Sequence, residues 1–457
     1  MKAVLIITAL SFISTVGVCT PLTLDAVLSS VRERYPLVEG AQKDVEAAGA
    51  EIRSSEGAFD IQWKTRVASS VLGYYQNDRL DSLIEKPTTL WGTNLFAGYR
   101  LGVGDFAIYD GKLKTNPGGE LRAGFNIPLW RDGPTDRRRA NIGRAKLGLQ
   151  VADLQVIQQR IDAVKEASNR YWDWVSAAKK VEIYQALLKI AVERDDGLKE
   201  RVKHGDLPEF ERRDNERAIL QRRSQLISAE RSLQQATIDL SLYFRDKEGN
   251  PIFAGPEHLG ANLPTPNPEA EPKEGLEKAL KSRPDLNRFQ LLKGQNEIEL
   301  ELAENQTAPK IDIQVQAIRS LQNGDPVRNG TQLEAGIQLE VPLQVNVAGG
   351  REDFSKATLA RLELQERFLK DKIAVEVYNA KSALNAALLR AQVTEQETQL
   401  AKKLEQGERV RFRQGDSNQL FVNIREQATA DAAVREVDAL ADYLKSLANL
   451  HAALGES

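Results

Sequence analysis

The sequence contains one series of landmarks twice in the same order, and this duplication constrains the fold more than any other feature. Each copy has an Asp-Ile-Gln segment, at 60–62 and 312–314, and ends in a Gly-Asp pair, at 205–206 and 415–416. Between these landmarks each copy carries an Ala-Gly segment that leads into Pro-Leu. A chain built this way is predicted to form two copies of one structural unit.

The duplication divides the chain into two repeats with a linker between them. The first repeat covers 21–244 and the second covers 274–457. Residues 245–273 contain six prolines, which favours an extended linker. The first repeat is the longer one, mainly because of an insertion at about 76–118.

Each repeat contains two segments in which apolar and polar side chains alternate. These segments are 61–75 and 119–129 in the first repeat, and 311–321 and 331–343 in the second. Successive side chains of a strand point to opposite faces, so each segment predicts a strand with one apolar and one polar face. Such strands fit a membrane barrel around a wet lumen. The polar positions expected to face the lumen are Lys64, Arg66, Arg122, Asp312, Gln314 and Glu334.

The number of strands bears on assembly. A soluble, half-buried sheet shows the same alternation, and an export signal and long helices favour the barrel. Four strands cannot close a barrel, since about eight is the usual minimum, so three copies would share one barrel of twelve strands. The insertion at 76–118 contains a further alternating stretch, 91–101. We predict an extracellular hairpin or plug there, with two additional membrane crossings as the less favoured alternative.

Long proline-free segments follow the predicted strands. No proline occurs between Pro134 and Pro208 or after Pro342, and the segments 135–203 and 350–413 are charged and rich in Ala and Leu. At 1.5 Å per residue, a helix of this length spans roughly 100 Å. No ordinary globular domain requires such a helix, whereas a tube that crosses the periplasm does.

Each long helix is predicted to turn back at a glycine, which gives helical hairpins at 135–243 and 350–453. Glycine suits the left-handed C-cap, Asp or Ser suits the next N-cap, and Pro208 suits the first helical turn. The returning helices are half as long as the outgoing ones. The helical segments 24–58 and 274–308 supply the remaining length, so the helices together predict a uniform cylinder.

The N-terminus and the composition narrow the class of protein. Residues 1–20 have one lysine, an apolar stretch and then small residues, which is typical of a secretory signal peptide. Cys19, the single cysteine, lies near the expected cleavage site and is either removed or lipidated. The net charge of −3 lacks the basic footprint of nucleic-acid binding. No catalytic, nucleotide-binding or metal-ligand spacing occurs, so we expect no enzyme activity and no cofactor.

The doubled Ala-Gly…Pro-Leu strands, the long proline-free helices and the turns at Gly205 and Gly415 resemble the TolC-type outer-membrane efflux factors over about 21–455. The resemblance implies an α+β homotrimer, with a twelve-stranded β-barrel in outer-membrane lipid and a twelve-helix α-barrel that continues into the periplasm. It also implies two protein partners, a periplasmic adaptor (membrane fusion protein) and an inner-membrane transporter.

The resemblance further implies functional residues at the ends of the hairpins. The alternative to a docking role is that the Gly and Asp residues serve only the turns. The alternative to a gating role is that the nearby charged residues lie on solvated helix faces. The implied adaptor-docking tips are Gly205, Asp206, Leu207, Gly415, Asp416, Ser417 and Leu420. The candidates for holding a periplasmic aperture are Asp195, Asp196, Glu405 and Glu408.

These features together predict the outer-membrane channel of a tripartite efflux or type I secretion system. The channel would be a passive export duct, and its inner-membrane partner would supply the energy for export. The alternative is a non-conducting structural coiled-coil protein of the cell envelope. Strands with one polar face discriminate between the two hypotheses, because a scaffold has no need of them.

Overall fold

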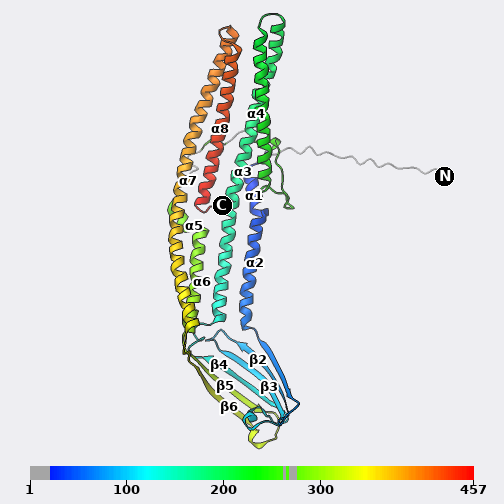
Figure 1. Ribbon diagram of the computed structural model, residues 1–457, viewed down its shortest axis with the longest axis vertical. Coiled ribbons are helices and arrows are strands. Elements are labelled where there is room, and N and C mark those ends of the chain that lie inside the picture. The colour runs from blue at the N-terminus through cyan, green and yellow to red at the C-terminus, as the bar shows by residue number, and fades with distance from the viewer. Residues whose placement is uncertain (1–20, 261–263, 267–274, 457) are drawn as a thin grey trace, which may run out of the picture. The chain divides into compact units, whose positions relative to one another are not determined.

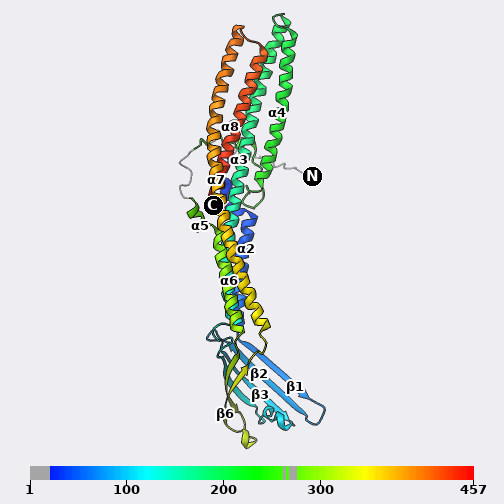
Figure 2. The same cartoon turned by 60° about the vertical axis from the view of Figure 1, so that its left-hand side comes forward.

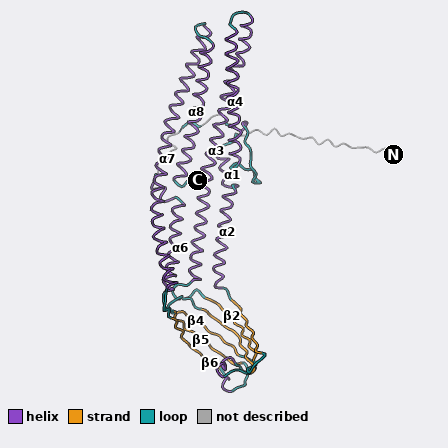
Figure 3. The backbone as a smooth tube through the Cα atoms, in the orientation of Figure 1, coloured by secondary structure: helices purple, strands orange, loops and turns teal. Residues whose placement is uncertain are grey.

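The computed structural model describes residues 21–260, 264–266 and 275–456, so the predicted signal peptide and Cys19 lie outside the described residues. The fold is α+β, with one sheet and long helices (Figures 1 and 3). It divides into a sheet unit, Gly40–Gln159 with Leu280–Ala374, and a helical unit. The helical unit consists of the described residues within Met1–Glu39, Arg160–Ala279 and Val375–Ser457. None of the described helices combines the length and apolar content that a membrane-spanning helix requires.

The sheet unit contains one antiparallel sheet of six strands, in the order β1-β2-β3-β4-β5-β6 (Figure 2). The strands are β1 (Gln62–Ser70), β2 (Asn77–Pro87), β3 (Asn94–Gly104), β4 (Glu120–Pro128), β5 (Lys310–Ser320) and β6 (Thr331–Glu340). Strands that follow each other along the chain are neighbours in the sheet. Within the described residues, β1 pairs only with β2 and β6 pairs only with β5, so the sheet is open at both edges.

The insertion at 76–118 supplies two of these strands, so the prediction of four strands per chain is wrong. β2 pairs with β1 from Gln62 to Ser70, and β3 pairs with β4. The predicted hairpin therefore lies inside the sheet instead of outside it, and the less favoured alternative of two additional strands is the correct one. Adding strands in a pair preserves the direction of β4, so the following helix leaves from the same end of the sheet at which β1 begins.

The strand register places apolar positions of all six strands on one face. One row across this face consists of Trp63, Ile84, Ala97, Ala123, Ala317 and Leu333. In a single chain the face is open to its surroundings, since the side chains of Trp63 and Ile337 are 75% and 74% exposed. A continuous apolar surface of this kind marks a site that protein or membrane covers.

The opposite face is polar, and its charges are paired between strands. The ion pairs are Lys64 with Glu85, Arg100 with Glu120, and Arg122 with Asp81. The register also places on this face every position predicted to line a lumen: Lys64, Arg66, Arg122, Asp312, Gln314 and Glu334. The two faces of the sheet therefore differ in polarity across its whole width.

The helices form a layer in each unit, and α3 and α7 contribute to both. The helices are α1 (Leu24–Arg34), α2 (Pro36–Glu56), α3 (Arg137–Lys203), α4 (Glu209–Ser241), α5 (Leu276–Ser282), α6 (Pro284–Gln306), α7 (Asn346–Gln414) and α8 (Gln419–Ala453). With 67 and 69 residues, α3 and α7 are each about 100 Å long.

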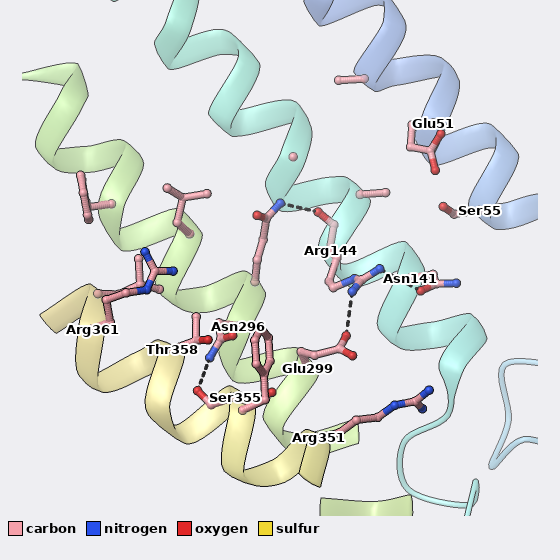
Figure 4. Close-up of a pocket in the computed structure, with 18 of the residues that line it drawn as sticks. Glu51, Ser55, Asn141, Arg144, Asn296, Glu299, Arg351, Ser355, Thr358 and Arg361 are labelled. Carbon is pink, nitrogen blue, oxygen red and sulfur yellow. Dashed lines mark hydrogen bonds and ion pairs between the residues drawn. The ribbon is translucent and has the colours of Figure 1, made fainter. Parts of the chain in front are cut away.

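In the sheet unit, α6 lies between α3 and α7. Arg144 of α3 pairs with Glu299 of α6 at 2.7 Å, and Lys293 of α6 pairs with Glu366 of α7 at 3.3 Å. Hydrogen bonds from Lys370 and Lys293 lower the pKa of Glu366. Figure 4 shows α2, α3, α6 and α7 around a pocket lined by both polar and apolar side chains. The pocket has a volume of about 1000 Å³. The four helices thus surround one pocket.

In the helical unit, α8 lies between α3 and α7, and α4 packs against both α3 and α8 (Figures 1 and 2). The contacts that establish this order are Lys445–Asp173 at 2.9 Å between α8 and α3, Arg390–Asp442 at 3.0 Å between α7 and α8, and Asn215 Nδ2 to the Ala191 carbonyl at 3.1 Å between α4 and α3.

The predicted linker is packed over its first part. The Ala254 carbonyl is buried and accepts a hydrogen bond from Trp174 Nε1 at 3.1 Å. The His258 carbonyl accepts one from the Leu22 amide at 2.8 Å. Residues 245–260 thus belong to the helical unit, and the prediction of an extended linker is wrong for them. Buried backbone carbonyls explain the packing, because each requires a donor.

Candidate functional site: the hairpin tips and the charged cluster behind them

The two hairpin turns have the same geometry. Gly205 and Gly415 have φ values of 81° and 84°, in the left-handed region that glycine adopts without a steric penalty. The Asp206 amide donates to the Arg201 carbonyl at 2.9 Å, and the Asp416 amide donates to the corresponding carbonyl at the same distance. This is the Schellman arrangement, which satisfies the last carbonyls of α3 and α7. The duplication seen in the sequence therefore extends to the capping hydrogen bonds.

The returning helices α4 and α8 begin at Glu209 and Gln419. Their N-cap residues are Pro208 and Asn418, so the predictions of Asp or Ser at the N-caps and of Pro208 in the first helical turn are wrong. The Asn418 side chain accepts from the Phe421 amide at 3.1 Å, as an N-cap requires. Ser417 instead donates to Glu408.

The tip residues are accessible. Gly205, Asp206, Gly415 and Asp416 are exposed, as is Leu420, whereas Leu207 and Ser417 are half-buried. Two aromatic residues absent from the predicted set lie beside them, Phe210 on α4 and Phe421 on α8, and both are exposed. Each tip therefore combines a tight turn with exposed apolar side chains, the composition of a protein-docking surface.

A charged cluster, consisting of Arg194, Arg222, Arg409 and Glu426, lies behind the tips. Arg222 and Glu426 are buried, whereas Arg194 and Arg409 are partly exposed. Glu426 of α8 is fully buried and accepts hydrogen bonds or ion pairs from three arginines, one on each of α3, α4 and α7. Its distances to Arg222 and Arg409 are both 3.0 Å. One carboxylate thereby joins all four helices of the layer.

The electrostatics of this cluster depend on Glu426. Burial lowers the pKa of the Arg194 guanidinium, and the Glu426 carboxylate partly offsets this by favouring the charged form. Arg222 is also buried and donates to the Leu187 carbonyl at 3.0 Å. Asn423 accepts from Arg194 at 2.7 Å. Buried ions are stable only when paired and hydrogen-bonded, so removal of Glu426 leaves three cations without their shared anion.

The predicted aperture residues lie near the cluster, but none of the four belongs to it. Glu405 pairs with Arg409 at 2.7 Å and so touches the cluster. Asp195 pairs with Lys199 at 2.9 Å, and Asp196, which is highly exposed, also contacts that lysine. Hydrogen bonds to these two carboxylates raise the pKa of Lys199. Glu408, the fourth candidate, accepts from Ser417.

Sequence reasoning missed Glu426 and Arg222, although a signal was present. On α8, Val422 and Ala430 are buried, and Glu426 lies four residues from each, so it occupies the same helix face as these core positions. Arg222 lies four residues after the buried Ala218 on α4. A charged residue at a core-facing position is the pattern that identifies a buried ion cluster.

Exposed apolar stripes run along α7 and α4. The stripe on α7 has spacings of three, four, seven or eleven residues, which keep its members on one face. Its residues are Leu364, Phe368, Val375, Tyr378, Leu389, Val393, Leu400 and Leu404. A shorter stripe on α4 consists of Leu220, Ile227 and Ile238. In one chain these side chains are exposed, so each stripe marks a surface that protein or membrane covers.

Several solved structures share this fold of helical hairpins joined to a sheet. The chain is similar to the MtrE outer membrane channel of Neisseria gonorrhoeae in its open state, with 16% identity, a TM-score of 0.69, and 95% of this chain and 89% of that one covered. It is similar to the CmeC outer membrane channel of Campylobacter jejuni, with 13% identity, a TM-score of 0.66, and coverages of 94% and 85%. It is also similar to the outer membrane protein VceC of Vibrio cholerae, with 14% identity, a TM-score of 0.67, and coverages of 95% and 96%. No family model and no curated protein matches the sequence.

Proposed function

We propose that this protein is an outer-membrane export channel, a passive duct that extends from the outer membrane into the periplasm. The observation that carries the proposal is the polarity of the sheet, with an exposed apolar face and a charged face across all six strands. Lipid covers the apolar face, and the charged face lines a water-filled lumen. The fold shared with known outer-membrane channels supports this assignment.

Three copies form the channel, as the family resemblance implies. An open six-stranded sheet requires further strands at both edges, and the exposed stripes on α7 and α4 require further helices. Three copies supply twelve helices, but they supply eighteen strands instead of the predicted twelve. At a strand spacing of about 4.8 Å and a tilt of about 40°, six strands cover roughly 38 Å of circumference. Four helices with spacings of about 8–10 Å cover a similar length of circumference. The circumference covered by four helices is therefore matched better by six strands than by four strands.

Planar-bilayer conductance, combined with particle mass in detergent, tests the channel. The expected result is a trimer that conducts ions. A trimer without conductance would favour the structural coiled-coil protein of the envelope, and a soluble monomer would contradict both hypotheses. Membrane extraction distinguishes the two further, since a barrel requires detergent for release.

Cysteine cross-linking tests the eighteen-stranded barrel. Directly opposed side chains of neighbouring strands lie about 4.5–5.5 Å apart at Cβ, within reach of a disulfide. Thr65→Cys on β1, combined in turn with Leu333→Cys, Ala335→Cys and Ile337→Cys on β6, is expected to give covalent trimers in one register. The control pairs Thr65→Cys with Ala97→Cys on β3, two strands away in the same chain. Failure of every β1–β6 pair to cross-link in a conducting trimer would refute the shared barrel.

The hairpin tips dock the periplasmic adaptor of a tripartite efflux or type I secretion system, and the adaptor links the channel to an inner-membrane transporter. The double variant Gly415→Arg with Leu420→Glu is expected to leave the trimer intact and to abolish export in cells that contain the native partners. Its matched control is Gly249→Arg with Phe253→Glu, which changes another left-handed glycine and another exposed apolar residue away from the tips. Normal export by the tip variant would exclude docking at this surface.

A further inference from the structure

We infer that the loop between β3 and β4, residues 105–119, is a lid that narrows the outer mouth of the barrel. The inference rests on the proposed channel, in which the polar face of the sheet is the inner wall. The loop lies at the end of the sheet opposite the helices, because α2 and α3 both join the other end. In the assembled channel this end opens to the exterior.

The lid folds back onto the polar face. Gly102 of β3 occupies a polar-face position, and a Cβ atom there would lie 1.9 Å from the Leu113 carbonyl oxygen and 3.3 Å from Phe106. Thr115, which is buried, donates its amide to the Gly102 carbonyl at 2.9 Å. Glycine at 102 is therefore required by the close approach of the lid to the wall.

The lid and the wall enclose a cavity of about 280 Å³. On the lid side it is lined by Gly111, Lys112 and Lys114. The wall side is formed by polar-face positions of four strands, including Arg100, Arg122, Gln316 and Glu334. Since one short segment shares a cavity with β3, β4, β5 and β6, the lid covers the polar face and not the apolar one.

Asn116 fastens the lid to the loop between β5 and β6, residues 321–330. This side chain is buried, and its Nδ2 donates to the Gln322 carbonyl at 3.1 Å and to Asn329 Oδ1 at 2.9 Å. Its Oδ1 accepts from the Asp325 amide at 3.0 Å. The side chain of Asn116 thereby fixes both loops in one arrangement, as a fully satisfied buried amide does.

Two large apolar side chains of the lid are exposed, next to the exposed Asp110. Ile108 and Tyr109 lie at its tip and are 98% and 85% exposed. Barrels of sixteen to eighteen strands leave an open aqueous channel, and apolar constrictions restrict ion flow by excluding water. Three lids around one axis would therefore narrow the mouth of a wide barrel, with Ile108 and Tyr109 of each lid exposed there.

The test measures single-channel conductance in chains that also carry Glu426→Ala, so that the periplasmic end does not limit the current. Replacing residues 106–113 with a Gly-Ser linker of the same length is expected to raise conductance at least twofold. The double variant Ile108→Ser with Tyr109→Ser changes fully exposed side chains and preserves the fold, and a smaller rise is expected. The control is Leu72→Ser with Tyr74→Ser, two exposed residues of the loop between β1 and β2, with no change expected.

The outcomes separate the lid from the channel itself. Absence of conductance in every variant, the parent included, would refute the proposed channel. A Glu426→Ala parent that conducts more than the unsubstituted channel, and whose current is unchanged by both lid variants, would refute the lid alone. An equal rise in the Leu72 and Tyr74 control would also overturn it, because general loosening of the outer loops would then explain the effect.

Discussion

Replacing Glu426 with alanine is expected to hold the periplasmic end of the channel open. The substitution leaves Arg194, Arg222 and Arg409 facing one another without the carboxylate that pairs with all three. Removing one partner from a buried ion pair costs about 3–5 kcal/mol, and each 1.4 kcal/mol changes an equilibrium constant about tenfold. The equilibrium constant between the joined and the separated arrangement of the two hairpins therefore shifts by at least two orders of magnitude toward separation. In planar bilayers the variant should spend most of its time in a high-conductance state.

The matched control is Glu397→Ala. Glu397 also joins α7 to α8, through Arg435 at 2.6 Å, but both side chains are nearly half exposed, and exposed pairs contribute about 0–1 kcal/mol. The conductance of the Glu397→Ala variant should equal that of the unsubstituted channel. Adding Arg222→Met to Glu426→Ala removes one of the unpaired cations, so partial closure is expected. A Glu426→Ala trimer with parental conductance would show that the charged cluster stabilises the fold without holding an aperture.

Local chemistry made the hairpins predictable from sequence. Gly205 and Gly415 determine where α3 and α7 end, because a left-handed C-cap is a property of one residue and its nearest neighbours. The polarity of the sheet faces was readable for the same reason, since alternation in one strand determines both faces. The N-caps were less certain because Asp206, Pro208 and Ser417 all suit a turn. The hydrogen bonds that each residue makes in the structure determine which residue is the N-cap.

The insertion and the charged cluster depend on contacts distant in sequence. β3 contains Gly98, Gly102 and Gly104, and glycine weakens any strand prediction. The structure explains these glycines through close neighbours, such as the Ser82 carbonyl that lies 2.3 Å from a Cβ built at Gly98. Glu426 and Arg222 are 204 residues apart. Their pairing follows from α4 and α8 meeting in space, which the spacing along either helix cannot reveal.

Assembly is expected to fail when the stripe on α7 is made polar. Val393 and Leu400 lie seven residues apart, about two helical turns, and both are exposed in a single chain. Burying such a side chain against a neighbouring copy stabilises the trimer by about 1.5–3 kcal/mol. The double variant Val393→Glu with Leu400→Glu loses this contribution three times over and places six carboxylates in the interfaces of the ring. Light scattering in detergent should therefore report monomers in place of trimers.

The same helix offers a control with identical charge and spacing. Gln392 and Gln399 are also exposed and seven residues apart, but they lie roughly 100° around the helix from Val393 and Leu400 respectively, since neighbouring residues differ by that angle. Gln392→Glu with Gln399→Glu should leave the trimer and its conductance unchanged. If both double variants assembled equally well, the stripe on α7 would not be an interface between copies. If both failed equally, added negative charge and not a specific apolar contact would account for the loss. Monomers from the stripe variant alone would establish that the exposed edge of each helix layer is completed by the next copy of the chain.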